Sequence, residues 1–134
     1  MRWCVPAIVL LCVAAAGCSS GASAATGRRF ADATAVARQA DCDYEAAAPP
    51  VDVAPRPASY GRCGYGPETV AVLVFDAEGA ADRAFSDVAC RRDPHARRRW
   101  FARGPNWFAT SADGSHGVRT IAAATGARVI DHGC

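Results

Sequence analysis

One run of six consecutive apolar residues constrains the fold of this chain more than any other feature. Residues 70–75 read Val-Ala-Val-Leu-Val-Phe, with no polar side chain among them. A strand with one face in water alternates apolar and polar residues, whereas an unbroken apolar run of this length is typical of a strand buried on both faces. The sequence therefore predicts a sheet with this strand in its interior and with further structure packed on each face.

The length and composition indicate one compact domain. The chain has 134 residues, of which 51% are hydrophobic, and its formal net charge is +2. This composition is too apolar and too weakly charged for a mainly disordered chain. The longest apolar stretch, Cys4–Ala16, would form a helix only about 20 Å long, against roughly 30 Å of membrane hydrocarbon. We therefore expect no transmembrane helix.

The N-terminus instead has the features of an export signal. The short basic segment Met1–Trp3 precedes the apolar stretch, and the residues Ala15-Ala16-Gly17-Cys18 follow at its end. These four residues resemble the lipobox of bacterial lipoproteins, in which a cysteine after two small residues is acylated and becomes the mature N-terminus. The family usually has leucine three positions before the cysteine, where this chain has Ala15.

The resemblance implies a division of the chain and a location. Residues 1–17 would be a lipoprotein signal peptide, residues 18–27 a flexible tether, and residues 28–134 a single domain with disulfides. Cys18 would carry the lipid, palmitate included, and hold the protein on the extracytoplasmic face of the cell membrane, as in the short lipoproteins of GC-rich Gram-positive bacteria. An alternative stays open, in which Ala22-Ser23-Ala24 is the cleavage site and the protein is secreted in soluble form.

Four cysteines remain once Cys18 is assigned to the anchor, namely Cys42, Cys63, Cys90 and Cys134. An even number in an exported domain predicts two disulfides, although the spacing alone allows three pairings. The chain has no C-x-x-C or H-x-x-x-H pair, so we expect no bound metal and no other cofactor.

Periodicity and turn residues predict the remaining elements. Apolar residues at three- and four-residue intervals from Phe30 to Ala40 indicate a first amphipathic helix. The other expected elements are a short strand near Cys42–Tyr44, a proline-rich surface loop over Ala46–Ser59, turns at Gly61, Gly64 and Gly66-Pro67, a helix over about Ala77–Arg91 capped by Asp76, a β-hairpin of Arg98–Arg103 and Asn106–Ser111, a helix over Ser115–Thr125 capped by Ser115 and ended by Gly126, and a last strand at Arg128–Ile130. In the hairpin, Trp107 and Phe108 alternate, so at least one of them should face the core.

The order of elements from about residue 68 to residue 134 is strand, helix, strand, strand, helix, strand. This order resembles the ferredoxin-like α+β sandwich, which we expect to be preceded by the N-terminal helix and the proline-rich loop. The resemblance implies that Cys90 and Cys134 reach the same edge of the sheet. On that basis the favoured disulfides are Cys42–Cys63 and Cys90–Cys134.

Charge is unevenly distributed along the chain. Residues 30–90 contain ten acids and four arginines, a formal −6, whereas residues 91–134 contain eight arginines and three acids, a formal +5. The candidate surface for anions or a partner consists of Arg91, Arg92, Arg97, Arg98, Arg99, Arg103 and Trp100. Guanidinium groups beside aromatic rings suit phosphates and carboxylates. In an exported protein this favours an anionic envelope component or a protein partner over nucleic acid, and the alternative is a basic edge that faces the protein's own acidic half.

The sequence offers no catalytic constellation that we can defend. The G-x-S-x-G motif is absent, and Ser115 and His116 are adjacent, so their side chains would not face each other on a helix. We therefore predict no catalytic residue and expect a non-catalytic binding or accessory module. The alternatives are a small extracytoplasmic enzyme that uses His95 or His132, and a structural envelope protein without a ligand.

Overall fold

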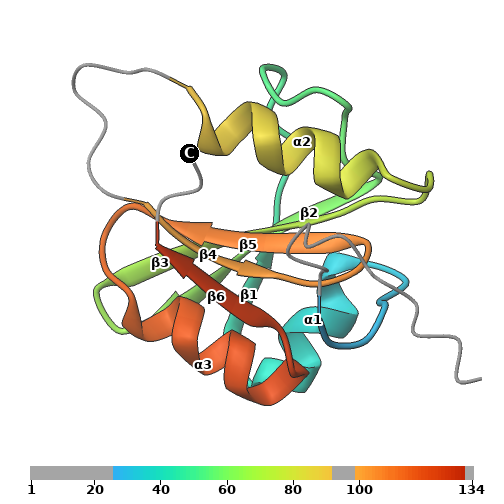
Figure 1. The fold of residues 1–134 in the computed structure, drawn as a ribbon. Coiled ribbons are helices and arrows are strands. Elements are labelled where there is room, and N and C mark those ends of the chain that lie inside the picture. Colours follow the sequence, from blue (N-terminus) through green and yellow to red (C-terminus); the bar gives the residue numbers. More distant parts are fainter. Residues whose placement is uncertain (1–25, 92–98, 132–134) are drawn as a thin grey trace, which may run out of the picture.

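The computed structural model describes residues 26–91 and 99–131, which form three helices and one six-stranded antiparallel sheet (Figure 1). The elements are α1 (Ala33–Ala40), β1 (Asp43–Ala46), β2 (Ser59–Tyr65), β3 (Glu68–Val74), α2 (Ala80–Ala89), β4 (Trp100–Arg103), β5 (Trp107–Ser111), α3 (His116–Thr125) and β6 (Arg128–Asp131). The strands lie in the order β1-β2-β3-β5-β4-β6. Helices α1 and α3 cover one face and α2 covers part of the other, so the predicted α+β class is confirmed.

The apolar run is an interior strand, as predicted. β3 lies between β2 and β5, and its side chains alternate between two cores. Val70, Val72 and Val74 face α1 and α3 and are fully buried, while Leu73, on the opposite side, packs below α2. These four positions are buried, so a polar side chain at any of them would lose its hydration.

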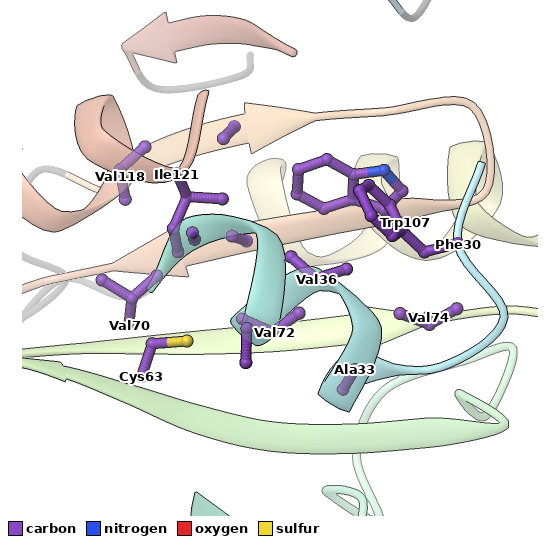
Figure 2. Close-up of a cluster of buried hydrophobic side chains, with 14 of the residues drawn as sticks. Phe30, Ala33, Val36, Cys63, Val70, Val72, Val74, Trp107, Val118 and Ile121 are labelled. Carbon is purple, nitrogen blue, oxygen red and sulfur yellow. The ribbon is translucent and has the colours of Figure 1, made fainter. Parts of the chain in front are cut away.

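The core under α1 and α3 is built around Trp107 (Figure 2). Its ring meets that of Phe30 edge-to-face, with 5.6 Å between centroids, and its indole N–H donates to the carbonyl of Arg28 at 3.1 Å. Helix α1 presents Val36 to this core and begins at Asp32, whose carboxylate accepts a hydrogen bond from the N–H of Ala35 at 2.8 Å. The predicted first helix is confirmed, with its N-cap supplied by a residue type that suits that position.

The core on the α2 side is aromatic. The ring of Phe85 on α2 lies 5.1 Å from that of Phe101 and 5.9 Å from that of Phe108, both edge-to-face. The predicted start of this helix was wrong. The helix begins at Ala80 behind Gly79, which adopts φ 71°, and no side chain caps it. The N-cap position is held by Gly79, three residues after Asp76, so Asp76 lies too early in the chain to cap this helix.

The β4–β5 hairpin is confirmed, and Gly104-Pro105 forms its turn. Trp107 and Phe108 are both buried, at 0% and 1% exposure, because the two faces of β5 meet different cores. The predicted turns at Gly61 and Gly64 were wrong, since both glycines lie inside β2 and only Gly66-Pro67 connects β2 to β3. Gly61 makes room for an aromatic ring, because a β-carbon there would lie 2.2 Å from Cε2 of Tyr44.

The topology does not clearly match the ferredoxin-like sandwich. β6 pairs with β4, and the edge of β3 away from β5 is occupied by β2. The two helices of the C-terminal half, α2 and α3, lie on opposite faces of the sheet rather than on one (Figure 1). The order of elements alone did not reveal this, because the strands that precede residue 68 join the same sheet.

Helix α3 lies unusually close to the sheet at its first turn. A β-carbon on Gly117 would lie 2.6 Å from Cγ2 of Val70 and 2.7 Å from Cδ2 of Tyr65. The predicted cap by Ser115 was wrong, since its side chain makes no capping hydrogen bond. The carboxylate of Glu68 on β3 caps the helix instead and accepts from the N–H of Gly117 at 2.7 Å and from that of His116 at 3.3 Å. The end at Gly126, with φ 73°, is as predicted.

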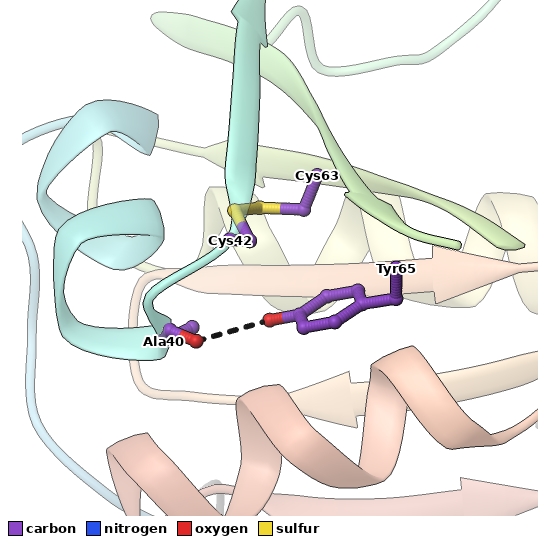
Figure 3. The surroundings of a disulfide bond; sticks show 4 residues. All are labelled: Ala40, Cys42, Cys63 and Tyr65. Carbon is purple, nitrogen blue, oxygen red and sulfur yellow. Dashed lines mark hydrogen bonds between the residues drawn. A yellow bond between two sulfur atoms is a disulfide. The ribbon is translucent and has the colours of Figure 1, made fainter.

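Cys42 and Cys63 form a disulfide, as predicted, with 5.3 Å between their Cα atoms (Figure 3). The bond joins the residue before β1 to the buried interior of β2, and the Tyr65 hydroxyl donates to the carbonyl of Ala40 beside it at 3.3 Å. Cys90, directly after α2, is also disulfide-bonded. Cys134 lies outside the described residues, so the pairing of Cys90 with Cys134 stays a prediction.

Candidate functional site

Two of the arginines singled out in the sequence, Arg91 and Arg103, pair with carboxylates of the same chain. Arg91 is bound to two carboxylates, with Nη1 2.6 Å from Oδ2 of Asp52 and Nη2 2.8 Å from Oδ2 of Asp87. Its Nη2 also donates to the backbone carbonyl of Asp52. Arg91 therefore holds the proline-rich loop against α2, where it faces the acidic half of the chain.

The hydrogen bond from Arg91 has an electrostatic consequence at the loop. It is the largest of the interactions that lower the pKa of the Asp52 carboxyl below its ordinary value, and the charges of Arg91 and Arg99 add to it. The same two carboxylates, with Asp87 first, raise the pKa of the Arg91 guanidinium. This group of charges is exposed, so each contact contributes little to folding.

Arg103 and Trp100 leave the same strand on opposite faces. Arg103 lies over the ring of Phe85 at 4.7 Å and pairs with Asp82 at 2.5 Å, both on α2. Trp100 packs against the core on the α3 side, where Arg119 lies 5.2 Å above its ring. Arg99 is exposed, while Arg92, Arg97 and Arg98 lie outside the described residues. Strand alternation thus separates two members of the predicted arginine and tryptophan surface.

A recess on the open part of the sheet is a better candidate site. It is a shallow hollow of about 300 Å³, and it is lined by Asp43 and Glu45 of β1, Arg62 and Gly64 of β2, and Thr69 of β3. These residues alternate with ones that face α1 and α3, such as Tyr44, Cys63 and Val70. The recess therefore lies on the same face as α2, on the part of the sheet that α2 leaves uncovered.

The strand register fixes the positions of the recess side chains. Glu45 lies directly opposite Arg62, and Asp43 lies opposite Gly64. A β-carbon on Gly64 would lie 3.7 Å from that of Asp43. Because the glycine has no side chain, the space beside this carboxylate stays open. Side chains on adjacent strands of a sheet are held more rigidly than side chains on a loop.

The recess combines two carboxylates with the guanidinium group of Arg62 and the hydroxyl group of Thr69. Within residues 26–91 and 99–131, the side chains of Asp43, Glu45 and Arg62 form no hydrogen bond or ion pair that meets ordinary distance limits. A third carboxylate, that of Asp113, accepts a hydrogen bond from the backbone N–H of Thr69 at 3.4 Å. The arrangement can therefore accept several hydrogen bonds from a cationic group while Arg62 binds an adjacent carbonyl or carboxylate.

Sequence reasoning missed this site because it interpreted Gly61 and Gly64 as turns. The sequence does contain a signal for strand β2. Over residues 60–65, positions alternate between the two faces with a period of two, which is the period of a strand. The alternation of Asp43 and Glu45 with Tyr44 marks the neighbouring strand in the same way.

The residues considered for chemistry are not arranged around a common centre. His116 stands edge-on to Tyr65, with 6.3 Å between ring centroids, and its backbone N–H is bound to Glu68. His95 and His132 lie outside the described residues. In the part of the chain that the structure describes, no three His, Cys, Asp or Glu side chains are grouped as metal ligands are. None of the helices in residues 26–91 and 99–131 has the length and hydropathy of a membrane-spanning helix.

Comparison of the chain with protein-family models, with curated proteins and with solved structures found no match.

Proposed function

We propose that this protein is a lipid-anchored, extracytoplasmic, non-catalytic binding module whose recess receives a cationic group of a partner. The observation that carries the binding role is the recess itself, in which Asp43 and Glu45 on a rigid sheet face the solvent beside Arg62. Two carboxylates against one guanidinium favour a lysine or arginine side chain of a protein or wall peptide. The anchor is supported by the lipobox resemblance at Cys18.

The binding role is tested by titrating the full mature protein with a short lysine-rich peptide and following backbone amide shifts. We expect shifts centred on Asp43, Glu45, Arg62 and Thr69, and a loss of affinity of at least about tenfold in the variant Asp43→Asn/Glu45→Gln. The matched control is Asp76→Asn/Glu78→Gln, which removes the same charge from the segment before α2. Equal weakening in both variants, or shifts spread over the whole surface, would contradict a defined site.

A second peptide separates a site from general charge attraction. In it the lysines are acetylated, which removes the cationic groups and leaves the backbone unchanged. We expect no binding at the recess. Undiminished binding of the acetylated peptide would overturn the cationic specificity.

The anchor is tested by mass spectrometry of the protein purified from a bacterial membrane fraction. We expect an N-terminal Cys18 that carries acyl chains, and we expect Cys18→Ala to abolish acylation and to release the protein from the membrane fraction. A mature chain that begins after Ala24, found in the culture medium, would support the soluble alternative instead.

A further inference from the structure

The described chain enters the fold at one end of the molecule, and it is fixed there. Gly27 packs on the connection between α3 and β6, so closely that a β-carbon on it would lie 2.8 Å from the carbonyl oxygen of Thr125 and 3.1 Å from the nitrogen of Ala127. The backbone carbonyl of the next residue, Arg28, accepts a hydrogen bond from the Trp107 indole N–H at 3.1 Å. The point of entry is therefore the end that holds the β4–β5 turn and the C-terminus of α3 (Figure 1).

Exposed arginines surround this point of entry. Arg28 and Arg29 follow Gly27, and Arg128 begins β6 beside the same connection. Arg28 donates to the Gln39 side chain at 3.2 Å, lies 5.0 Å from the centroid of the Phe30 ring, and forms no ion pair within residues 26–91 and 99–131. Arg29 and Arg128 have no ion pair with any residue of 26–91 or 99–131. Arg128 in fact lies opposite Arg103 in the strand register, so its neighbour across the sheet is another cation.

Carboxylates gather at the opposite end of the molecule. They are those of Asp43 at the start of β1, Glu68 after the β2–β3 turn and Asp113, which accepts from the N–H of Thr69. Carboxylates also lie nearer the arginines. Asp32 follows Arg29 by three residues, Asp82 pairs with Arg103, and Asp76 and Glu78 lie in the segment that leads to α2. A negatively charged surface would therefore repel the far end, while Arg29 and Arg128 are cations that it can contact at the end around Gly27.

The proposed anchor keeps the arginine end near a membrane. Eight peptide units separate Cys18 from Thr26, so the chain between them can reach at most about 28 Å. A link of this length gives the domain an effective concentration on the order of millimolar at the membrane surface. Contacts between arginines and headgroups can then form even though each is weak. The far end of the domain is one domain diameter farther from the membrane than the arginine end. That distance exceeds the Debye length of about 8 Å, so salt screens its charges from the headgroups.

We infer that Arg28, Arg29 and Arg128 form a contact surface for anionic lipid headgroups, which orients the domain with its tether end toward the membrane. This inference rests on the lipid anchor of the proposed function. In this orientation the recess, whose Asp43, Gly64 and Thr69 belong to the far half of the sheet, is presented away from the bilayer.

The test uses the acylated full mature protein, isotope-labelled and reconstituted into nanodiscs that contain a gadolinium-chelating lipid. The measured quantity is the ratio of paramagnetic broadening at Gly27 and Arg29 to that at Gly66 and Ser115. We expect this ratio to rise at least about twofold when phosphatidylglycerol is added to phosphatidylcholine, and to fall back in high salt. An equal ratio in the two lipid compositions would overturn the inference.

Paired variants separate the arginine surface from net charge. Arg29→Ser/Arg128→Ser should remove the effect of phosphatidylglycerol, whereas Arg99→Ser/Arg119→Ser, which removes the same charge from the residue before β4 and the first turn of α3, should retain it. The same response in both variants would show that overall charge and not this surface orients the domain. Mass spectrometry of the reconstituted sample reports acylation of Cys18 independently, so a failed anchor is distinguished from an anchored domain without a preferred orientation.

Discussion

Asn106 and Phe30 are joined by a reciprocal pair of hydrogen bonds across 76 positions of the chain. The backbone N–H of Phe30 donates to Oδ1 of Asn106 at 3.1 Å, and Nδ2 of Asn106 donates to the carbonyl of Phe30 at 2.8 Å. The same amide donates to the carbonyl of Phe75 at 3.2 Å. One side chain in the β4–β5 turn thus satisfies the segment before α1 and the end of β3 together.

Replacing Asn106 with alanine should therefore destabilise the domain more than most polar substitutions. Asn106 is only 7% exposed, and its loss would leave the Phe30 N–H and two carbonyls buried without partners. We expect a loss of about 2–4 kcal/mol in the free energy of unfolding, measured by urea denaturation. Asn106→Asp keeps the acceptor for the Phe30 N–H but turns a carboxylate oxygen toward the carbonyls of Phe30 and Phe75, so it should destabilise the domain at least as much. A loss below about 0.5 kcal/mol for the alanine variant would mean that water replaces the amide.

The cap of α3 by Glu68 predicts a smaller but specific effect. Glu68→Ala removes the acceptor for the Gly117 and His116 N–H groups and should cost about 1 kcal/mol of unfolding free energy. Amide exchange should accelerate mainly in the first turn of α3. Glu45→Ala, on the exposed face of β1, is the matched control and should change stability little. Identical exchange patterns in the two variants would argue against the cap.

Asp52 should titrate in acid below the ordinary aspartate value of 3.8, because Arg91 stabilises its ionised form. Carboxyl chemical shifts measured against pH report this pKa directly. Since the folded-state pKa is lowered, the contact stabilises the fold above the ordinary value and is lost as the pH falls through the lowered one.

In Arg91→Ser the pKa of Asp52 should return toward its ordinary value. The control Arg83→Ser, on α2, should leave it lowered. An unchanged Asp52 titration in Arg91→Ser would refute the assignment of the shift to Arg91.

The disulfide between Cys42 and Cys63 closes a segment with a sequence separation of 21 residues. The double variant Cys42→Ala/Cys63→Ala should lose about 3 kcal/mol of unfolding free energy in the chain-entropy estimate. Because the bond ties β1 to β2, we also expect weaker peptide binding at the recess. A variant that retained full stability, measured by thermal unfolding with the bond of Cys90 intact, would show that the sheet alone fixes β1.

The elements predicted correctly from the sequence are those in which a local signal and burial agree. The unbroken apolar run of β3, the apolar stripe of α1 and the Gly104-Pro105 turn each specify their structure within a few residues. The pairing of Cys42 with Cys63 followed from the ferredoxin-like resemblance, and it is correct even though the topology differs.

The failures share a physical cause, which is that the deciding partner lies far away in the sequence. Gly61 has the composition of a turn, and only the ring of Tyr44 on the neighbouring strand makes a glycine useful there. Ser115 has the right position for a cap, but the carboxylate that caps the helix belongs to Glu68, which is 48 positions from His116 in the sequence. The recess depends in the same way on strand register, which no local spacing reveals.

The close approach of α3 to the sheet also limits how this sequence can diverge. A side chain at position 117 would collide with Val70 and Tyr65, so a substitution there requires smaller residues at positions 65 and 70 or a displaced helix. Distant relatives should consequently exchange these positions in concert, and the joint occurrence of glycine at 117 with an aromatic residue at 65 is a steric signature by which they can be sought.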